Sequence, residues 1–194
     1  MSLKGDLSYL RSIRIYILIS VLLFFGTAIL GYIAAAYDPK FADTWLQSLD
    51  ALRWIRDLSP LMIMVVIFAK NLFSCILSVL LGLGIGLVPM IVATSNGILL
   101  GVVAYNVIQK DGPLYLLAGI VPHGIIELPV VLICVAMGMR LGHLFILAVL
   151  KERSDLSGET RMAIHLLFKR AAPLLLLAAV IESFITPLIL SVVP

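Results

Sequence analysis

One apolar stretch decides the fold. It covers residues 60–108 and reads PLMIMVVIFAKNLFSCILSVLLGLGIGLVPMIVATSNGILLGVVAYNVI. The stretch contains a single charged residue, Lys70. It is long enough to cross a bilayer twice, because one crossing of the hydrocarbon core takes about 20 apolar residues. Residues 82–89, GLGIGLVP, permit a tight turn between the two crossings. We therefore predict membrane spans at 61–81 and 89–108.

The rest of the chain also has the composition of a membrane protein. Of its 194 residues, 62% are hydrophobic and 13% are charged, whereas soluble domains carry about a quarter charged residues. A soluble protein of this size could not hide so much apolar surface. Apolar stretches at 15–36, 114–139 and 171–192 predict three more spans. The prediction is an all-α integral membrane protein, with one transmembrane domain over 1–194, about five helices, and the lipid bilayer as its main partner.

The segments outside these spans are less apolar. The first span is longer than the core of a signal peptide, so we interpret it as an uncleaved membrane helix. In 41–58, Phe41 and Trp45 begin a helical pattern typical of an amphipathic segment in the external interface; an exposed hairpin packed on the bundle is the alternative. Residues 151–170 are predicted as a cytoplasmic loop with a short amphipathic end. Residues 141–150 either extend the fourth span or form a sixth membrane element.

Basic residues predict the orientation, because cytoplasmic loops of membrane proteins carry an excess of Lys and Arg. With the N-terminus inside, nine basic residues are cytoplasmic and four are external. The nine are Lys4, Arg11, Arg14, Arg140, Lys151, Arg153, Arg161, Lys169 and Arg170, and the four are Lys40, Arg53, Arg56 and Lys110. We expect a multi-pass protein of the cell membrane with a cytoplasmic N-terminus and an external C-terminus. The basic residues are scattered without aromatic interleaving, so no nucleic-acid partner is expected.

Glycine pairs four residues apart let membrane helices approach closely. Three such pairs predict tight packing, either within the chain or in a homodimer: Gly82 with Gly86, Gly97 with Gly101, and Gly138 with Gly142.

Four of the predicted spans carry polar residues near their midpoints. Ionisable groups in the hydrocarbon core cost several kcal/mol and mark functional positions. Groups at matched depth in one bundle can meet, which is the cheapest way to satisfy them. We therefore predict a buried set, called here the midplane cluster, that consists of Lys70, Asn71, Asn96, His123, Glu127 and Glu182.

The sequence around His123 predicts a local break in the fourth helix. Residues 121–129 read VPHGIIELP, and His123 and Glu127 are four apart, so they share one helix face. Pro122 favours the start of a new helical segment, and Pro129 frees a further carbonyl. Broken helices at membrane depth line cavities and form transporter substrate sites. The full prediction is a bundle with a broken fourth helix and interfacial amphipathic segments.

The midplane cluster fits more than one chemistry. His123, Glu127 and Glu182 could bind a divalent metal such as zinc, or relay protons, since histidine titrates near neutral pH. The structural alternative is that Lys70 neutralises a glutamate while the other groups complete hydrogen bonds that lock the bundle. An intramembrane hydrolase is disfavoured and no enzyme is expected, because the sequence has neither HExxH nor GxSxG.

Four motifs together carry a family resemblance. They are Lys70-Asn71, Asn96-Gly97 with Gly101, PHGIIELP at 122–129 and IESFITP at 181–187. In this combination the chain resembles the stage II sporulation protein M family over most of its length. The resemblance implies a polytopic membrane protein with these polar residues as its signature. In spore-forming bacteria the family's namesake acts with peptidoglycan-degrading partners as a membrane scaffold.

Two functional hypotheses follow. In the first, the protein is a membrane scaffold or assembly factor with membrane-protein partners, and the cluster is structural. In the second, it is a metal-binding protein or an ion- or proton-coupled transporter, and the cluster holds the ion.

Overall fold

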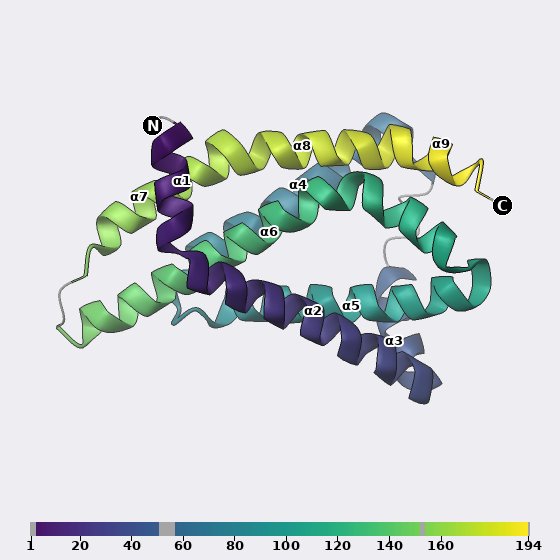
Figure 1. Cartoon of the computed structure of the whole chain (residues 1–194), viewed down its shortest axis with the longest axis horizontal. Helices are drawn as coiled ribbons and strands as arrows, with labels where there is room; N and C mark the ends of the chain where they lie inside the picture. The colour runs from purple at the N-terminus through teal and green to yellow at the C-terminus, as the bar shows by residue number, and fades with distance from the viewer. Residues whose placement is uncertain (1–2, 51–56, 152–153, 194) are drawn as a thin grey trace.

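The computed structural model describes residues 3–50, 57–151 and 154–193, and the regular secondary structure within these ranges is helical (Figure 1). Five helices of this described part are long and apolar enough to cross a membrane: Arg14–Tyr37, Pro60–Leu83, Leu87–Asp111, Pro113–Val149 and Leu156–Leu190. The prediction of an all-α membrane protein with about five spans is confirmed. The N- and C-termini lie at opposite ends of the long axis, as an odd number of crossings requires (Figure 1).

The spans are built from the following elements. The first half of the chain contains α1 (Leu3–Ser12), α2 (Arg14–Tyr37), α3 (Pro39–Asp50), α4 (Pro60–Leu80), the 3₁₀ turn η2 (Leu81–Leu83) and α5 (Leu87–Asp111). The second half contains α6 (Pro113–Val149), α7 (Leu156–Leu166), η3 (Leu167–Ala171), α8 (Ala172–Val180), η4 (Ile181–Ile185) and α9 (Thr186–Leu190). Both η3 and η4 are π-helical, and the last five elements follow one another as one long helix.

The amphipathic segment after the first span is partly described. Helix α3 packs through Phe41, Ala42 and Trp45 against Ala35 at the end of α2 and Val102 of α5. The apolar face of α3 is therefore covered by the bundle. Residues 51–56 of the predicted 41–58 segment lie outside the described residues.

The fourth span differs from its prediction. Helix α6 is continuous over 37 residues and contains Pro122 and Pro129 without an interruption, so the predicted broken fourth helix is not seen. A proline removes one hydrogen bond and clashes with the preceding turn, and a helix can absorb this by bending. Figure 1 shows the ribbon of α6 bending in its first half. The helix also runs through 141–149, so these residues extend the fourth span and form no sixth membrane element.

Most of the predicted cytoplasmic loop at 151–170 is helical. Helix α7 begins after Asp155, whose Oδ1 accepts a hydrogen bond from the backbone N–H of Gly158 at 2.9 Å. This is the N-cap that satisfies a free donor at a helix start. Ala163 and Leu166 are buried against the bundle, and the helix continues into the last span. This polar stretch therefore forms a helix with one side packed against the bundle, and not a loop.

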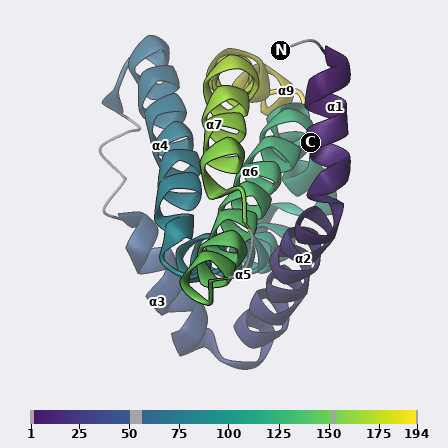
Figure 2. The same cartoon turned by 90° about the vertical axis from the view of Figure 1, so that its left-hand side faces the viewer.

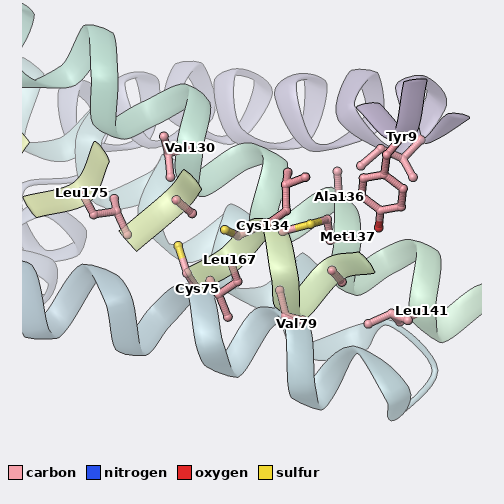
Figure 3. Close-up of a cluster of buried hydrophobic side chains, with 14 residues drawn as sticks. Tyr9, Cys75, Val79, Val130, Cys134, Ala136, Met137, Leu141, Leu167 and Leu175 are labelled. Atoms are coloured by element: carbon pink, nitrogen blue, oxygen red, sulfur yellow. The ribbon is translucent and has the colours of Figure 1, made fainter. Parts of the chain in front are cut away.

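The hydrophobic core lies towards the end of the bundle that holds α1 and α7. Figure 2 shows α6 running between α4 on one side and α2 on the other. The second part of α6 is buried from Val130 to Leu144 at most positions, whereas no residue of its first part is fully buried. Figure 3 shows the core, in which Cys75 of α4 and Cys134 of α6 lie among aliphatic side chains as free, buried cysteines. One half of the bundle is therefore solidly packed.

The glycine pairs allow close contacts between helices of the same chain. A Cβ placed on Gly101 would lie 2.6 Å from the backbone nitrogen of Tyr32 on α2, and one on Gly82 would lie 2.6 Å from Cα of Gly138 on α6. A Cβ on Gly142 would lie 2.5 Å from Cα of Gly86. Backbones at this separation exclude any side chain. The three pairs thus join helices of one chain, and the homodimer stays a prediction.

Candidate functional site

All six residues of the midplane cluster line one cavity of about 770 Å³. Lys70 and Asn71 come from α4, Asn96 comes from α5, and the remaining three come from α6 and η4. The cavity lies beside the first part of α6, where the packed core ends. Matched depth along four spans thus corresponds to a shared space in the structure.

Three of these residues converge closely. His123, Glu127 and Glu182 each offer one potential ligand atom, and the three atoms lie within 4.8 Å of one another. Ligand atoms around a tetrahedral zinc ion lie roughly 3.4 Å apart, given metal–ligand distances of about 2.1 Å. Small side-chain adjustments would therefore bring the three atoms to a common ion. The first two residues share a face of α6 because they are one helical turn apart.

Glu182 reaches the site from an irregular stretch of the last span. It lies in the π-helix η4, and the hydroxyl of Thr186 donates to the carbonyl oxygen of Ile181 at 3.3 Å across this wide turn. Single π-turns in α-helices shift the following side chains around the axis and occur at functional sites. Pro187 directly follows, and it lacks the N–H that a regular helix would require there.

Several polar atoms of the cluster are buried without a partner. Nδ1 of His123 and Oε2 of Glu127 are buried and have no hydrogen bond among the described residues. Asn71 is buried and lies within hydrogen-bonding reach of the Glu127 carboxylate. Asn96 instead turns back on its own helix, where Nδ2 donates to the carbonyl oxygen of Val92 at 2.7 Å. The hydrogen bonds of the cluster are therefore incomplete.

Lys70 occupies an unusual position for a cation. It lies at the centre of α4 and is exposed, although it lines the cavity. Its charge acts on Glu127 and Glu182, but within the described part of the chain no carboxylate lies within 4.0 Å of its ammonium group. Lys70 therefore acts on the two glutamates across a distance longer than a direct ion pair, and the structural alternative, in which it neutralises one of them, stays open.

The apolar walls of the cavity were not predicted. Leu99, Leu100 and Val103 of α5 form one side, and residues of α6 including Ile120 and Leu128 form another. In a membrane span, hydropathy gives the same signal for residues that face lipid, core or cavity. No feature of the sequence separates these positions.

A second polar group lies outside the cavity and was also missed. Nε of Arg140 is 3.7 Å from Oε2 of Glu159, and its guanidinium carbon lies 5.7 Å from the ring centroid of Tyr16. The hydroxyl of Tyr16 contacts Nδ1 of His143. The spacing of Arg140 and His143, three apart on one helix, is the sequence signal that could have indicated it. These contacts join α2, α6 and α7 and have the character of a structural network.

Comparison with known proteins identifies the family. The family model described as stage II sporulation protein M matches residues 20–187, which include all six cluster residues. No curated protein and no solved structure matches the chain significantly. Because the family model covers most of the chain, the resemblance seen in the motifs is confirmed, and the chain belongs to the stage II sporulation protein M family.

Proposed function

We propose that this protein binds a divalent cation of the zinc class inside its membrane bundle, through His123, Glu127 and Glu182. One observation supports this above all: three potential ligand atoms from two spans converge within 4.8 Å beside a cavity. Imidazole with carboxylates suits zinc and related transition metals, whereas magnesium and calcium favour oxygen ligands alone. The cation is bound and takes part in no hydrolysis, in keeping with the lack of an HExxH motif.

The unsatisfied atoms favour a bound ion over a purely structural cluster. A buried polar group without a partner costs about 1–3 kcal/mol. A cluster whose only task was to lock the helices would place these atoms in hydrogen bonds. His123 Nδ1 and Glu127 Oε2 have none among the described residues, and a metal ion would satisfy groups of this kind.

The orientation is part of the same proposal. We propose a cytoplasmic N-terminus and an external C-terminus in the cell membrane. The count of nine basic residues against four supports it. Arg140 and Arg170 contact groups of α7 and α1, which places two of the nine at the end of the bundle where the chain begins.

Elemental analysis of the purified full-length chain tests the proposal. After loading with zinc and removal of free metal, we expect one zinc ion per chain in the native protein and almost none in Glu127→Gln or Glu182→Gln. Glu159→Gln is the matched control, because it removes a partly buried carboxylate outside the cavity. Equal zinc in all four proteins, or none in the native chain, would contradict the proposal.

A scaffold or assembly role is the second candidate. Family membership and the glycine contacts, which bring helix backbones together without room for side chains, favour a rigid body in the membrane. In this case Glu127→Gln lowers thermal stability in detergent, and membrane-protein partners are retained after metal removal. Zinc or proton flux in proteoliposomes that Glu127→Gln abolishes would instead support the transporter form of the first proposal.

A further inference from the structure

We infer that the cavity also binds a monoanionic amphiphile taken from the bilayer, with its head group between Lys70 and the proposed cation and its chain along the apolar walls. This inference rests on the proposed function, because the cation supplies part of the charge that would hold the head group.

The size of the cavity exceeds what an ion needs. It measures about 770 Å³, whereas one water molecule takes about 30 Å³ of liquid volume. Cavities of about 300–1,000 Å³ are typical of sites for organic ligands. A single ion with its ligands would leave most of the space unfilled.

The lining of the cavity has two sides of different character. The polar side is the midplane cluster, and the apolar side carries aliphatic residues from α4, α5 and α6. Water would gain few hydrogen bonds along the apolar side, and an alkyl chain would bury apolar surface there at about 25 cal/mol per Å². The residues of the apolar side include Ile67, Leu99, Leu100, Val103, Ile120 and Leu128.

The charges around the cavity select the sign of the head group. Lys70 and a divalent cation bring three positive charges, and Glu127 and Glu182 bring two negative ones, if His123 binds as a neutral ligand. One positive charge remains, in a region where an unpaired charge is costly. A monoanionic head group, either a carboxylate or a phosphodiester, would balance it, and Lys70 has no carboxylate within ion-pair distance among the described residues.

The cavity is open where such a ligand would enter. Lys70 is exposed, and Val121 and Ile125, which line the cavity from α6, are 42% and 69% exposed. These residues lie within membrane spans, so the opening faces the bilayer. An amphiphile could therefore enter sideways without leaving the membrane.

Photocrosslinking with amphiphiles of defined head group tests the inference. The zinc-loaded full-length protein is labelled with a fatty acid, or a single-chain lysophosphatidylglycerol, that carries a diazirine on its chain. We expect crosslinks on α5 near Leu99 and Val103, reduced several-fold for the uncharged methyl ester of the same fatty acid. Lys70→Gln should also reduce labelling several-fold, whereas Lys40→Gln, an exposed lysine on α3, should not. Excess acetate should not displace the probe, because the chain contributes to binding.

Two further measurements separate the possible failures. Val103→Trp narrows the apolar side and should reduce labelling while zinc content stays at the native level. If the chain binds zinc but neither charged probe labels the cavity, the inference is overturned and the proposed function stands. The same holds if Lys70→Gln leaves the labelling unchanged. Displacement by acetate overturns it in favour of a free anion. A chain that binds no zinc overturns the proposed function, and this inference falls with it, because the charge balance requires the cation.

Discussion

Arg170 forms an ion pair with Asp6: its Nε donates a hydrogen bond to Oδ2 at 2.9 Å, and its Nη2 lies 2.8 Å from the same oxygen. The contact joins α1 to the π-helical turn η3 at the start of the last span. The Asp6 side chain is only 8% exposed. The first and last helices of the described chain are thus held together by one charged contact.

Loss of this contact should destabilise the fold. Arg170→Met leaves the Asp6 carboxylate buried without its partner, which costs about 1–3 kcal/mol. We expect a lower Tm in detergent for this variant. Lys169→Met serves as the control, because Lys169 is the exposed basic neighbour. Equal Tm values for the two variants would show that the contact adds nothing to stability.

The glycine contacts predict a clear contrast between positions. Gly101→Ala would place a methyl group 2.6 Å from the backbone nitrogen of Tyr32, so α2 and α5 must separate. Overpacking of this kind costs about 1–3 kcal/mol. Gly26→Ala meets nothing within 4 Å and should be neutral or stabilising, since alanine is the better helix former. Denaturation in detergent of both variants checks the prediction, which an equally stable Gly101→Ala would contradict.

Because the Tyr9 hydroxyl is buried, we expect the folded chain to lose stability at alkaline pH. Burial, followed by the charge of nearby Glu159, raises the pKa of Tyr9 well above its usual value. The folded chain therefore keeps this proton when the unfolded chain has lost it, so stability falls above about pH 10, by up to roughly 1.4 kcal/mol per pH unit. Tm measured from pH 8 to 11 should fall less steeply for Tyr9→Phe. Tyr37→Phe, at an 87% exposed position, should follow the native curve.

Thiol labelling distinguishes the packed core from the cavity. Cys75 is fully buried in the core, whereas its neighbour Ser74 lines the cavity. In a chain whose native cysteines are replaced by alanine, Ser74→Cys should react with N-ethylmaleimide under native conditions. The native Cys75 and Cys134 should react only after unfolding. Equally slow labelling of Ser74→Cys would contradict an accessible cavity.

The sequence predicted correctly the features that depend only on the order of residues along the chain. Twenty apolar residues make a span wherever they fall, so hydropathy alone predicts five spans. The matched depths of Lys70, Asn96 and Glu182 could also be predicted from the sequence, because residues at the same depth in a small bundle lie close to one another. The structure places all three around one cavity.

The sequence failed where tertiary packing decides. Pro122 and Pro129 predicted a break, but a long helix held by neighbours can bend and stay continuous. The polar stretch at 151–170 predicted a loop, because its buried positions, Ala163, Leu166 and Leu167, are few among polar residues. The contact between Asp6 and Arg170 could not be predicted, because the two residues are separated by almost the entire length of the chain. The available signal was the helical spacing of Asp6 and Tyr9 on α1, followed by Ile13 directly after the helix.

The position of Lys70 also has a consequence for biogenesis. A ribosome makes α4 before α6 and η4, so the lysine enters the bilayer before the glutamates of the cluster have been synthesised. A lysine at the centre of a span costs about 2.5–3.5 kcal/mol on insertion, and the aliphatic residues around it must offset this at the translocon. The cavity acquires its full set of charges only when the last span arrives. Assembly of this site is therefore a late event, and a chain truncated before Glu182 would contain only one of its two glutamates.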